Sequence, residues 1–417
     1  MSTIEIPYGK SFVTVDVPSE NLIGVLEGVP TPAPSLTSAF AEAWEEPIGL
    51  DDPAGLLRPG ESVVFVVTDH TRRTPTGDLL PLIWERVRST VAAEDVTLLV
   101  ATGTHRSPTA EELDAMLGDA RRRFLVKIHD CEGDCVEVGV SSLGNPILLN
   151  RLVVEADHVI TIGHVGMHYY AGYSGGRKNI FPGVAAASSI ERNHALMDRP
   201  ESRPCVYEGN PISEEMVEAG KRIRYDFLVD VVLSGGGGVA KVVVGEPEAA
   251  HKVARTYWDE HFQVPLDERA DLVIASAGGH PKDINLYQAH KGEYNASLAT
   301  RDGGITYLAG ACPKGIGHPV FTDWIERSET PDDVLRIYEQ EGFKLGGHKA
   351  VYLAKDRKRI DLALQSELDD DLVRRFFMIP MSDPSEALDL ARERFGEAFR
   401  VLVMPHAAST FPVLPCP

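Results

Sequence analysis

The chain has 417 residues, of which 43% are hydrophobic and 25% charged, a composition typical of a globular protein with two or three domains. Its 62 acidic residues against 41 basic ones leave a formal charge of −21, which argues against a nucleic-acid or anionic-membrane partner. No stretch approaches the ~20 apolar residues of a membrane span, and the N-terminus has no basic start followed by an apolar run. We therefore expect a cytoplasmic protein, and a local basic pocket could still bind a small anion.

The N-terminal residues predict a short β-hairpin, a linker and a helix. Alternating residues over 4–8 and 12–15, broken by proline and glycine, favour the hairpin. Three prolines between residues 30 and 34 mark the linker, and a helical pattern covers Leu36 to Trp44.

Three buried strands of a parallel sheet are predicted next. Continuous apolar runs cover Ser62–Thr68, Val96–Ala101 and His158–Gly163, as expected of strands that are covered on both faces. Helical patterns lie between them, over Leu79–Ser89 and after an N-cap at Thr109. Each strand ends in a polar segment with a histidine, at the edge where ligands bind in such sheets.

A second α/β domain is expected to begin near residue 266. Asp271–Ser276 is a new buried strand, and further strands are predicted over Gly304–Ala309, Lys349–Ala354 and Arg400–Met404, with a helix over Asp332–Glu341. The prediction is therefore an α/β protein of two domains, 1–265 and 266–417, with largely parallel sheets and the active site in the cleft between the domains.

Two glycine-rich segments have different expected roles. The residues from Gly235 to Ala240 match the spacing of a dinucleotide fingerprint, but a strand follows them where the fingerprint needs a helix, so we favour a hairpin. The segment 172–179 resembles a phosphate loop without matching one, because Arg177 precedes Lys178 and Asn179 follows it. It could bind an anion or be an ordinary surface turn.

Several polar residues are candidates for chemistry. His164 and His168 have the spacing of helical zinc ligands, but the glycines around them make a helix doubtful. His105 and His168 lie in strand-end segments suited to general acid–base catalysis. On a helix, Gln288 and Lys291 would share a face and could hold a carboxylate, or be an ordinary exposed pair. Cys131 and Cys135, near His129, are half of a zinc motif, and we expect unligated thiols.

Taken together, these segments resemble the nickel-dependent lactate racemase family of 2-hydroxyacid racemases and epimerases. The resemblance rests on separate blocks in the family's order, which are Asp69-His70-Thr71-Arg72, Gly103-Thr104-His105-Arg106, residues 168–183, Arg192-Asn193-His194 and residues 286–291. The two spacings between His168, Lys178 and His194 are also those of the family.

The resemblance implies a nickel-pincer nucleotide cofactor, made by dedicated cofactor-synthesis proteins and covalently tethered at Lys178. By the same resemblance His194 is the nickel ligand, while His105 and His168 are the catalytic acid/base pair. Asp69, Thr71 and Arg72 contact the cofactor, and Arg72, Gln288 and Lys291 bind the substrate carboxylate. Such enzymes move the hydrogen of a 2-hydroxy acid as hydride onto the cofactor, and the protein supplies binding and proton transfer.

The sequence also departs from the family pattern. Arg73 follows Arg72 where the family has proline, and the segment 342–349 lacks the pocket tryptophan of the lactate enzyme. The expected substrate is therefore lactate or a larger 2-hydroxy acid, with Tyr294 and His348 as candidate pocket residues.

Two other functions are compatible with these residues. One is a zinc- or iron-dependent hydrolase or dehydratase that binds its metal through His105, His168 and His194. The other is a carboxylate- or nucleotide-binding protein without catalytic activity.

Overall fold

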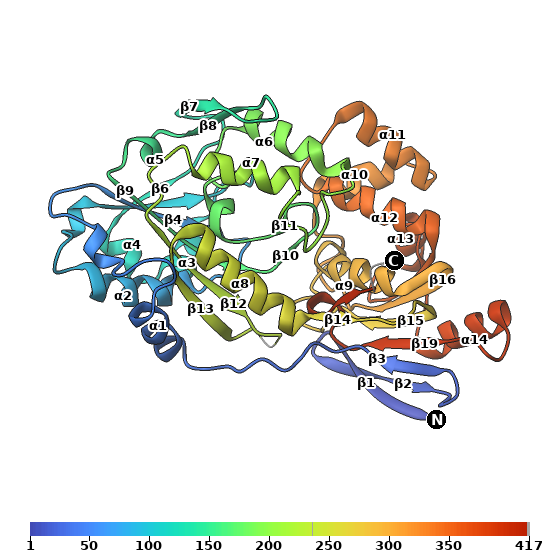
Figure 1. Ribbon diagram of the computed structural model, residues 1–417. Coiled ribbons are helices and arrows are strands. Elements are labelled where there is room, and N and C mark those ends of the chain that lie inside the picture. Colours follow the sequence, from blue (N-terminus) through green and yellow to red (C-terminus); the bar gives the residue numbers. More distant parts are fainter. Residues whose placement is uncertain (236, 415–417) are drawn as a thin grey trace. The chain divides into compact units, whose positions relative to one another are not determined.

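The computed structural model describes residues 1–235 and 237–414, which form two compact units (Figure 1). One unit consists of residues 31–259, and the other of residues 1–30 together with 260–417. Each unit is built around its own six-stranded, mainly parallel sheet, so the expected α/β fold with two parallel-sheet domains is confirmed.

The first thirty residues belong to a different unit from the one that the sequence analysis assigned to them. The strand β3 (Leu22–Val25) pairs in parallel with β19 (Val401–Met404). The hairpin of β1 (Ser2–Tyr8) and β2 (Ser11–Val17) packs its buried side chains against the same sheet. These long-range contacts carry no local sequence signal, because the pairing partner lies near the other end of the chain.

The sheet of unit 31–259 has the strand order β13-β12-β9-β4-β5-β6. All neighbours are parallel except β12 and β13. The strands are β4 (Val63–Thr68), β5 (Val96–Ala101), β6 (Leu125–Ile128), β9 (His158–Val165), β12 (Phe227–Leu233) and β13 (Val239–Gly245). The three strands predicted in this region are therefore confirmed as β4, β5 and β9.

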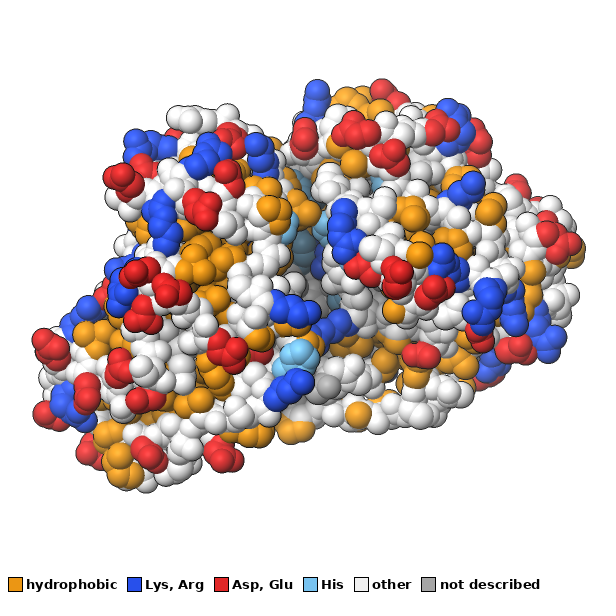
Figure 2. All heavy atoms as spheres, turned by 180° about the vertical axis from the view of Figure 1, so that it is seen from behind, with side chains coloured by type: hydrophobic (Ala, Val, Ile, Leu, Met, Phe, Trp, Pro, Cys, Tyr) orange, Lys and Arg blue, Asp and Glu red, His pale blue; other side chains and the backbone are white. Residues whose placement is uncertain are grey.

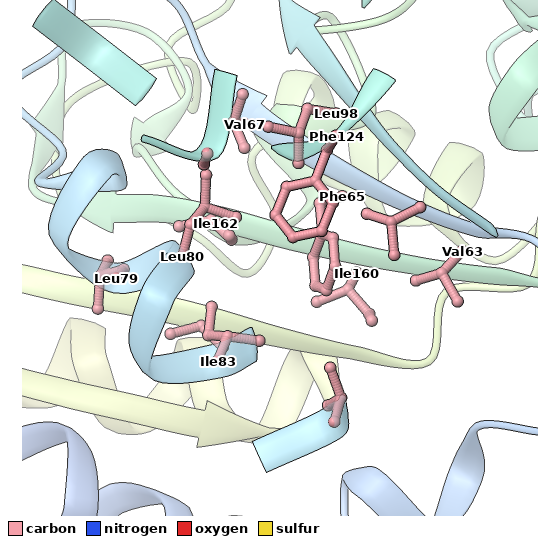
Figure 3. Close-up of a cluster of buried hydrophobic side chains, with 14 of the residues drawn as sticks. Val63, Phe65, Val67, Leu79, Leu80, Ile83, Leu98, Phe124, Ile160 and Ile162 are labelled. Atoms are coloured by element: carbon pink, nitrogen blue, oxygen red, sulfur yellow. The ribbon is translucent and has the colours of Figure 1, made fainter. Parts of the chain in front are cut away.

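One face of this sheet is covered by the helices that lie early in the chain. Alternate side chains of the strands, such as Phe65 and Ile160, form a buried cluster with helix residues such as Leu80 and Ile83 (Figure 3). The helices of this face are α1 (Leu36–Glu45), α2 (Thr76–Val87), α3 (Ala110–Leu117) and α4 (Ala120–Arg123). Thr109 is the N-cap of α3, as the sequence predicted, and it forms a capping box with Glu112.

The other elements of unit 31–259 lie later in the chain. Because side chains alternate across a strand, residues such as Asp230 point to the face opposite the cluster, where the loop 174–179 contacts β9. The remaining elements are β7 (Cys135–Val140), β8 (Pro146–Asn150), α5 (Arg151–Glu155), β10 (Met167–His168), β11 (Gly172–Tyr173), α6 (Ala187–His194), α7 (Pro211–Gly220) and α8 (Pro247–Phe262).

The strand order creates a switch point between β4 and β9. The chain proceeds from β4 to β5 and β6 on one side, and from β9 to β12 on the other. Ligands of open α/β sheets bind beyond the carboxyl ends of the strands at such a point. The residues after β4 begin with Asp69, and those of the carboxyl end of β9 lead to His168.

The sheet of the second unit is fully parallel, in the order β18-β17-β16-β15-β19-β3. Its further elements are β14 (Gln263–Pro265), β15 (Ala270–Ser276), α9 (Leu286–Ala299), β16 (Thr300–Ala309), α10 (Pro319–Glu326), α11 (Pro331–Glu341), α12 (Gly347–Arg359), β17 (Asp361–Gln365), α13 (Asp370–Arg375), β18 (Ile379–Pro380), α14 (Pro384–Phe395) and β20 (Phe411–Val413). The predicted strands at 271, 304 and 400 and the predicted helix at 332 are confirmed.

The predicted strand over Lys349–Ala354 is wrong, because these residues lie inside α12. The apolar run Ala350-Val351-Tyr352-Leu353 is largely buried, and a short buried run does not distinguish a helix from a strand. The strand of this region is β17, which begins directly after the helix ends.

The glycine-rich segment after β12 connects two antiparallel strands, β12 and β13. This confirms the predicted strand after the glycines, while Gly236 itself lies outside the described residues. In the part of the chain that the structure describes, we find no helix with both the length and the apolar character needed to cross a bilayer. On the face in Figure 2, acidic and basic side chains are interspersed rather than separated.

Candidate functional site

A buried carboxylate and a histidine form a pair at the carboxyl end of β4. Asp69 is 2% exposed, and its Oδ2 lies 2.5 Å from Nδ1 of His105, which follows β5. The other oxygen, Oδ1, accepts hydrogen bonds from the backbone N–H of Thr71 at 3.1 Å and from its hydroxyl at 2.6 Å. The neighbouring strands β4 and β5 thus bring together two residues that are 36 positions apart.

The electrostatics of this pair determine where the histidine carries its proton. Burial by itself would raise the pKa of Asp69, but the hydrogen bond and charge of His105, with Thr71 and Arg72, hold that pKa below its ordinary value. The carboxylate is therefore ionised at neutral pH, and an ionised carboxylate only accepts hydrogen bonds. Nδ1 of His105 must donate, so the lone pair of the neutral ring lies on Nε2.

His168 is held in a different way, on the short strand β10. The backbone N–H of Ala171 donates to its Nδ1 at 3.3 Å, so the neutral ring carries its proton on Nε2. Its ring is edge-on to Tyr170, with centroids 4.6 Å apart. His164 lies on strand β9 and His168 on strand β10, so they are not a pair on one helix, as the glycines around them led us to expect.

His194 is the last residue of α6 and is 5% exposed. Tyr170, which contacts His168, also packs against the ring of His194 at 5.1 Å. Nδ1 of His194 lies 3.1 Å from Oδ1 of Asn193, whose amide nitrogen donates to the buried carboxylate of Glu215 at 2.8 Å. Because the amide nitrogen serves Glu215, the amide oxygen accepts from His194, and the ring lone pair lies on Nε2.

Lys178 lies in a tight loop, and the two glycines at its start, Gly175 and Gly176, leave no space for a larger side chain. Gly175 and Gly176 both have positive φ, 80° and 54°, which glycine adopts without strain. They lead into the single 3₁₀ turn Gly176–Asn179. Burial, and then the positive charges of Arg72 and Arg177, lower the pKa of the Lys178 amine well below its ordinary value.

Arg177 is not the solvated cation of a surface turn. It is 1% exposed, and its guanidinium bonds Ser213 at 2.8 Å and His251 at 3.0 Å. It also stacks on the ring of Tyr207 at 4.0 Å. The alternative in which residues 172–179 form an ordinary surface turn with a solvated cation is therefore excluded at Arg177.

The predicted carboxylate clamp lies on α9, in the other unit. Gln288 is exposed and Lys291 partly exposed, on one helical face as expected. Tyr294 and His348 are 9% and 7% exposed, with Tyr294 against Tyr352 and His348 stacked on Phe343.

The structure groups the candidate residues of unit 31–259 in two sets. Asp69, Thr71 and His105 are linked by hydrogen bonds, while the rings of His168 and His194 both pack against the ring of Tyr170. Among residues 1–235 and 237–414, no three His, Cys, Asp or Glu side chains are grouped so as to hold a metal ion.

Sequence reasoning missed four residues that support the site, namely Tyr170, Glu215, Asp230 and His251. Tyr170 lies within the quoted block of residues 168–183, so its position could have suggested a role. The other three are buried on α7, β12 and α8, where polar residues give no signal until the fold is known.

Comparison with known proteins identifies the family. Residues 8–204 match the model of the lactate racemase N-terminal domain, and residues 266–411 match that of the lactate racemase C-terminal domain. A lactate racemase of Thermoanaerobacterium thermosaccharolyticum is 31% identical, with 98% of this chain and 99% of that protein covered. The chain belongs to the lactate racemase family.

Other lactate racemase relatives agree with this assignment. The lactate racemase of Lactiplantibacillus plantarum is 29% identical over 97% of this chain and 98% of that protein. The solved lactate racemase apoprotein of T. thermosaccharolyticum superposes with a TM-score of 0.91, at 31% identity, over 99% of this chain and 100% of that one. A Thermotoga maritima protein shares the fold alone, at a TM-score of 0.63 and 20% identity over 87% of this chain and 97% of that one.

Membership of the lactate racemase family confirms the expected class of enzyme, a racemase. It also implies a cofactor, in keeping with the sequence analysis.

Proposed function

We propose that this chain inverts the stereocentre of a 2-hydroxy acid with a nickel-pincer nucleotide attached to Lys178. The observation that carries the proposal is the Asp69–His105 pair at the switch point, 2.5 Å between Oδ2 and Nδ1. It gives a racemase of this family an oriented general base at the edge of the sheet where ligands bind. We also propose that the protein acts in the cytoplasm and receives its cofactor from dedicated synthesis proteins.

The residues of unit 31–259 fit such a cofactor. An amine must be unprotonated to attack a carbon, and the low pKa of Lys178 favours that form. A metal-binding histidine typically donates its second ring N–H to a protein group, and His194 donates its Nδ1–H to Asn193. Nε2 of His194 is then the nitrogen that would bind nickel. The chemistry that the cofactor supplies is acceptance of a hydride from the substrate carbon and its return.

The protein's own part is to bind the acid and move its hydroxyl proton. Nε2 of His105 takes the proton from one enantiomer, and the Asp69 carboxylate stabilises the imidazolium that forms. His168 takes that role for the other enantiomer. To do so it must carry its proton on Nδ1 and give up the 3.3 Å contact with Ala171, a long hydrogen bond that costs little to break.

The substrate carboxylate is assigned to three cationic or amide side chains, Arg72, Gln288 and Lys291. Arg72 is exposed, and its backbone is held beside the Asp69–His105 pair because its N–H donates to the Asp69 carbonyl at 3.1 Å. A guanidinium, an amide and an ammonium all donate hydrogen bonds to a carboxylate. The substrate is lactate or a larger 2-hydroxy acid, for which the absent pocket tryptophan leaves room.

The test is co-expression with the cofactor-synthesis proteins, followed by intact-mass measurement and chiral chromatography on single enantiomers of several 2-hydroxy acids. The wild type should carry a covalent mass adduct and racemise at least one acid. Lys178→Ala should fold and lose the adduct. An adduct on the mutant shows that another residue is the tether, and a wild type that racemises none of the acids contradicts the proposed function.

Nickel analysis of His105→Ala and His168→Ala separates this proposal from the rival three-histidine hydrolase. Under the proposal both mutants keep nickel, because His194 is the assigned ligand. Loss of metal from both mutants would instead support the rival.

A further inference from the structure

The loop that carries Lys178 is held by a buried histidine that the proposed reaction does not use. His251 lies on α8, is 0% exposed, and contacts the loop at two places. Its Nε2 lies 2.9 Å from the carbonyl oxygen of Ser174, and its Nδ1 lies 3.0 Å from Nη1 of Arg177. One side chain thus joins the residue before the two glycines to the residue after them.

These two contacts fix the tautomer of His251. A carbonyl oxygen only accepts and a guanidinium only donates, so Nε2–H donates to Ser174 and the lone pair of Nδ1 accepts from Arg177. The ring is neutral in this arrangement, because a second proton on Nδ1 would face the N–H of Arg177. Burial and the adjacent Arg177 charge, which lower the pKa of His251 well below its ordinary value, agree with this.

The loop is enclosed on its other side by Asp230 of β12. Oδ2 of this buried carboxylate accepts the backbone N–H of Gly176 at 2.6 Å. A Cβ at Gly176 would lie 3.0 Å from the His251 ring, and a Cβ at Gly175 would lie 2.6 Å from Oδ2 of Asp230. The backbone between Ser174 and Lys178 is therefore confined between the ring of His251 and the carboxylate of Asp230.

Arg177 transmits this constraint to its neighbour. Its guanidinium is held by His251, by Ser213 and by the ring of Tyr207. With Arg177 fixed, the backbone of Lys178 is fixed as well, and its N–H donates to Gly175 while its carbonyl accepts from Gly183.

We propose that His251 is a positioning residue for Lys178, acting as a neutral bridge between Ser174 and Arg177 that fixes the attachment loop. This rests on the proposed function, in which Lys178 attaches the cofactor. Without the bridge the loop samples other conformations, and the amine meets its reaction partner less often in the required geometry.

The experiment compares four variants by two measurements. His251→Ala removes both contacts, His251→Gln retains a donor near Nε2 for Ser174, and His251→Asn retains an acceptor near Nδ1 for Arg177. The control is His158→Ala, since His158 is also 0% exposed and bonds Glu61 and Asp226 at the start of β9. The measurements are hydrogen exchange of the amides of residues 175–179 in the purified protein, and the covalently loaded fraction after co-expression.

We expect His251→Ala to speed exchange of the loop amides by at least about tenfold, which corresponds to about 1.4 kcal/mol, and to lower the covalently loaded fraction. The Gln and Asn variants should lie between Ala and wild type. His158→Ala should leave both readouts at the wild-type level, although it too loses buried contacts. A general loss of stability would move the control as far as His251→Ala.

Unchanged loop exchange in His251→Ala, or equal effects of His251→Ala and His158→Ala on loop exchange and loading, would overturn the positioning role. If the alanine variant does not fold, the Gln and Asn variants decide. Faster loop exchange than wild type in both supports the bridge, and wild-type exchange in both overturns it. A wild type without covalent cofactor contradicts attachment at Lys178 instead, so failure of the proposed function is read separately.

Discussion

Asp69→Asn should disable the general base, His105, while leaving the shape of the site in place. Oδ1 of Asp69 accepts two hydrogen bonds from Thr71, at 3.1 and 2.6 Å. These bonds place the amide oxygen of the new side chain at the Oδ1 position, and therefore place its NH₂ group opposite Nδ1 of His105. A donor in that place cannot face the Nδ1–H, so the ring must move its proton to Nε2.

The expected loss of rate follows from the tautomer. With a proton on Nε2, His105 has no lone pair with which to take the hydroxyl proton, and loss of a general base lowers kcat by ~10²- to 10⁴-fold. This is roughly 3 to 5 kcal/mol added to the activation barrier. Stability should fall less, by about 1.5 to 3 kcal/mol for one hydrogen bond to a charged group.

The assay measures kcat on both enantiomers of a substrate, with intact mass and nickel analysis of the same preparation. The matched control is Asp226→Asn, because Asp226 also bonds a buried histidine, His158, at 3.3 Å but at the other end of β9. That variant should retain its rate. An Asp69→Asn enzyme with full cofactor and a rate within about fivefold of wild type would refute the orientation argument. Loss of cofactor would show that Asp69 contacts the cofactor, as the resemblance implies.

Three further predictions concern groups that support the site. Asn193→Ala removes the acceptor for Nδ1–H of His194 and should weaken nickel binding by roughly 10- to 100-fold, measured by competition with a chelator; unchanged affinity would contradict the tautomer argument. The pKa of Asp230 is raised by burial to about 7, so this one group should contribute a loss of unfolding free energy of roughly 4 kcal/mol as pH rises from about 4 to 7. In denaturant titrations at pH 4 and pH 7, the difference in unfolding free energy between Asp230→Asn and the wild type should shift in favour of the mutant by that amount, and an unchanged difference would refute the assignment. Gly176→Ala, at φ 54° beside the His251 ring, should cost about 1 to 3 kcal/mol, and a wild-type Tm would count against the enclosed path.

The sequence could predict the parts of the fold that have local signals. Continuous apolar runs identified β4, β5, β9 and β15, and the N-cap Thr109 identified the start of α3. The run at Lys349–Ala354 was misread because a buried helix and a buried strand are both apolar over six residues.

The support of the site could not be predicted, because its signals are not local. Asp230 sits in an apolar strand and His251 in a helix, and each acquires a role only when the loop 174–179 packs against it. Family blocks identified Lys178 and His194. The residues that hold the Lys178 loop, Asp230 and His251, lie 54 and 74 positions from the loop residues that they contact, while Asn193, which orients His194, lies in the same helical turn. Such residues become visible only through contacts in three dimensions.

The pairing of β3 with β19 has a consequence for the order in which the chain acquires its structure. Residues 31–259 leave the ribosome as one uninterrupted stretch and can fold as soon as they emerge, since domains generally fold as units during synthesis. The strand Leu22–Val25 is made before this unit, but its partner Val401–Met404 is made only after it. The strand β3 must therefore wait for β19 while residues 31–259 are synthesised, and an excised C-terminal unit would need residues 1–30 supplied to complete its sheet.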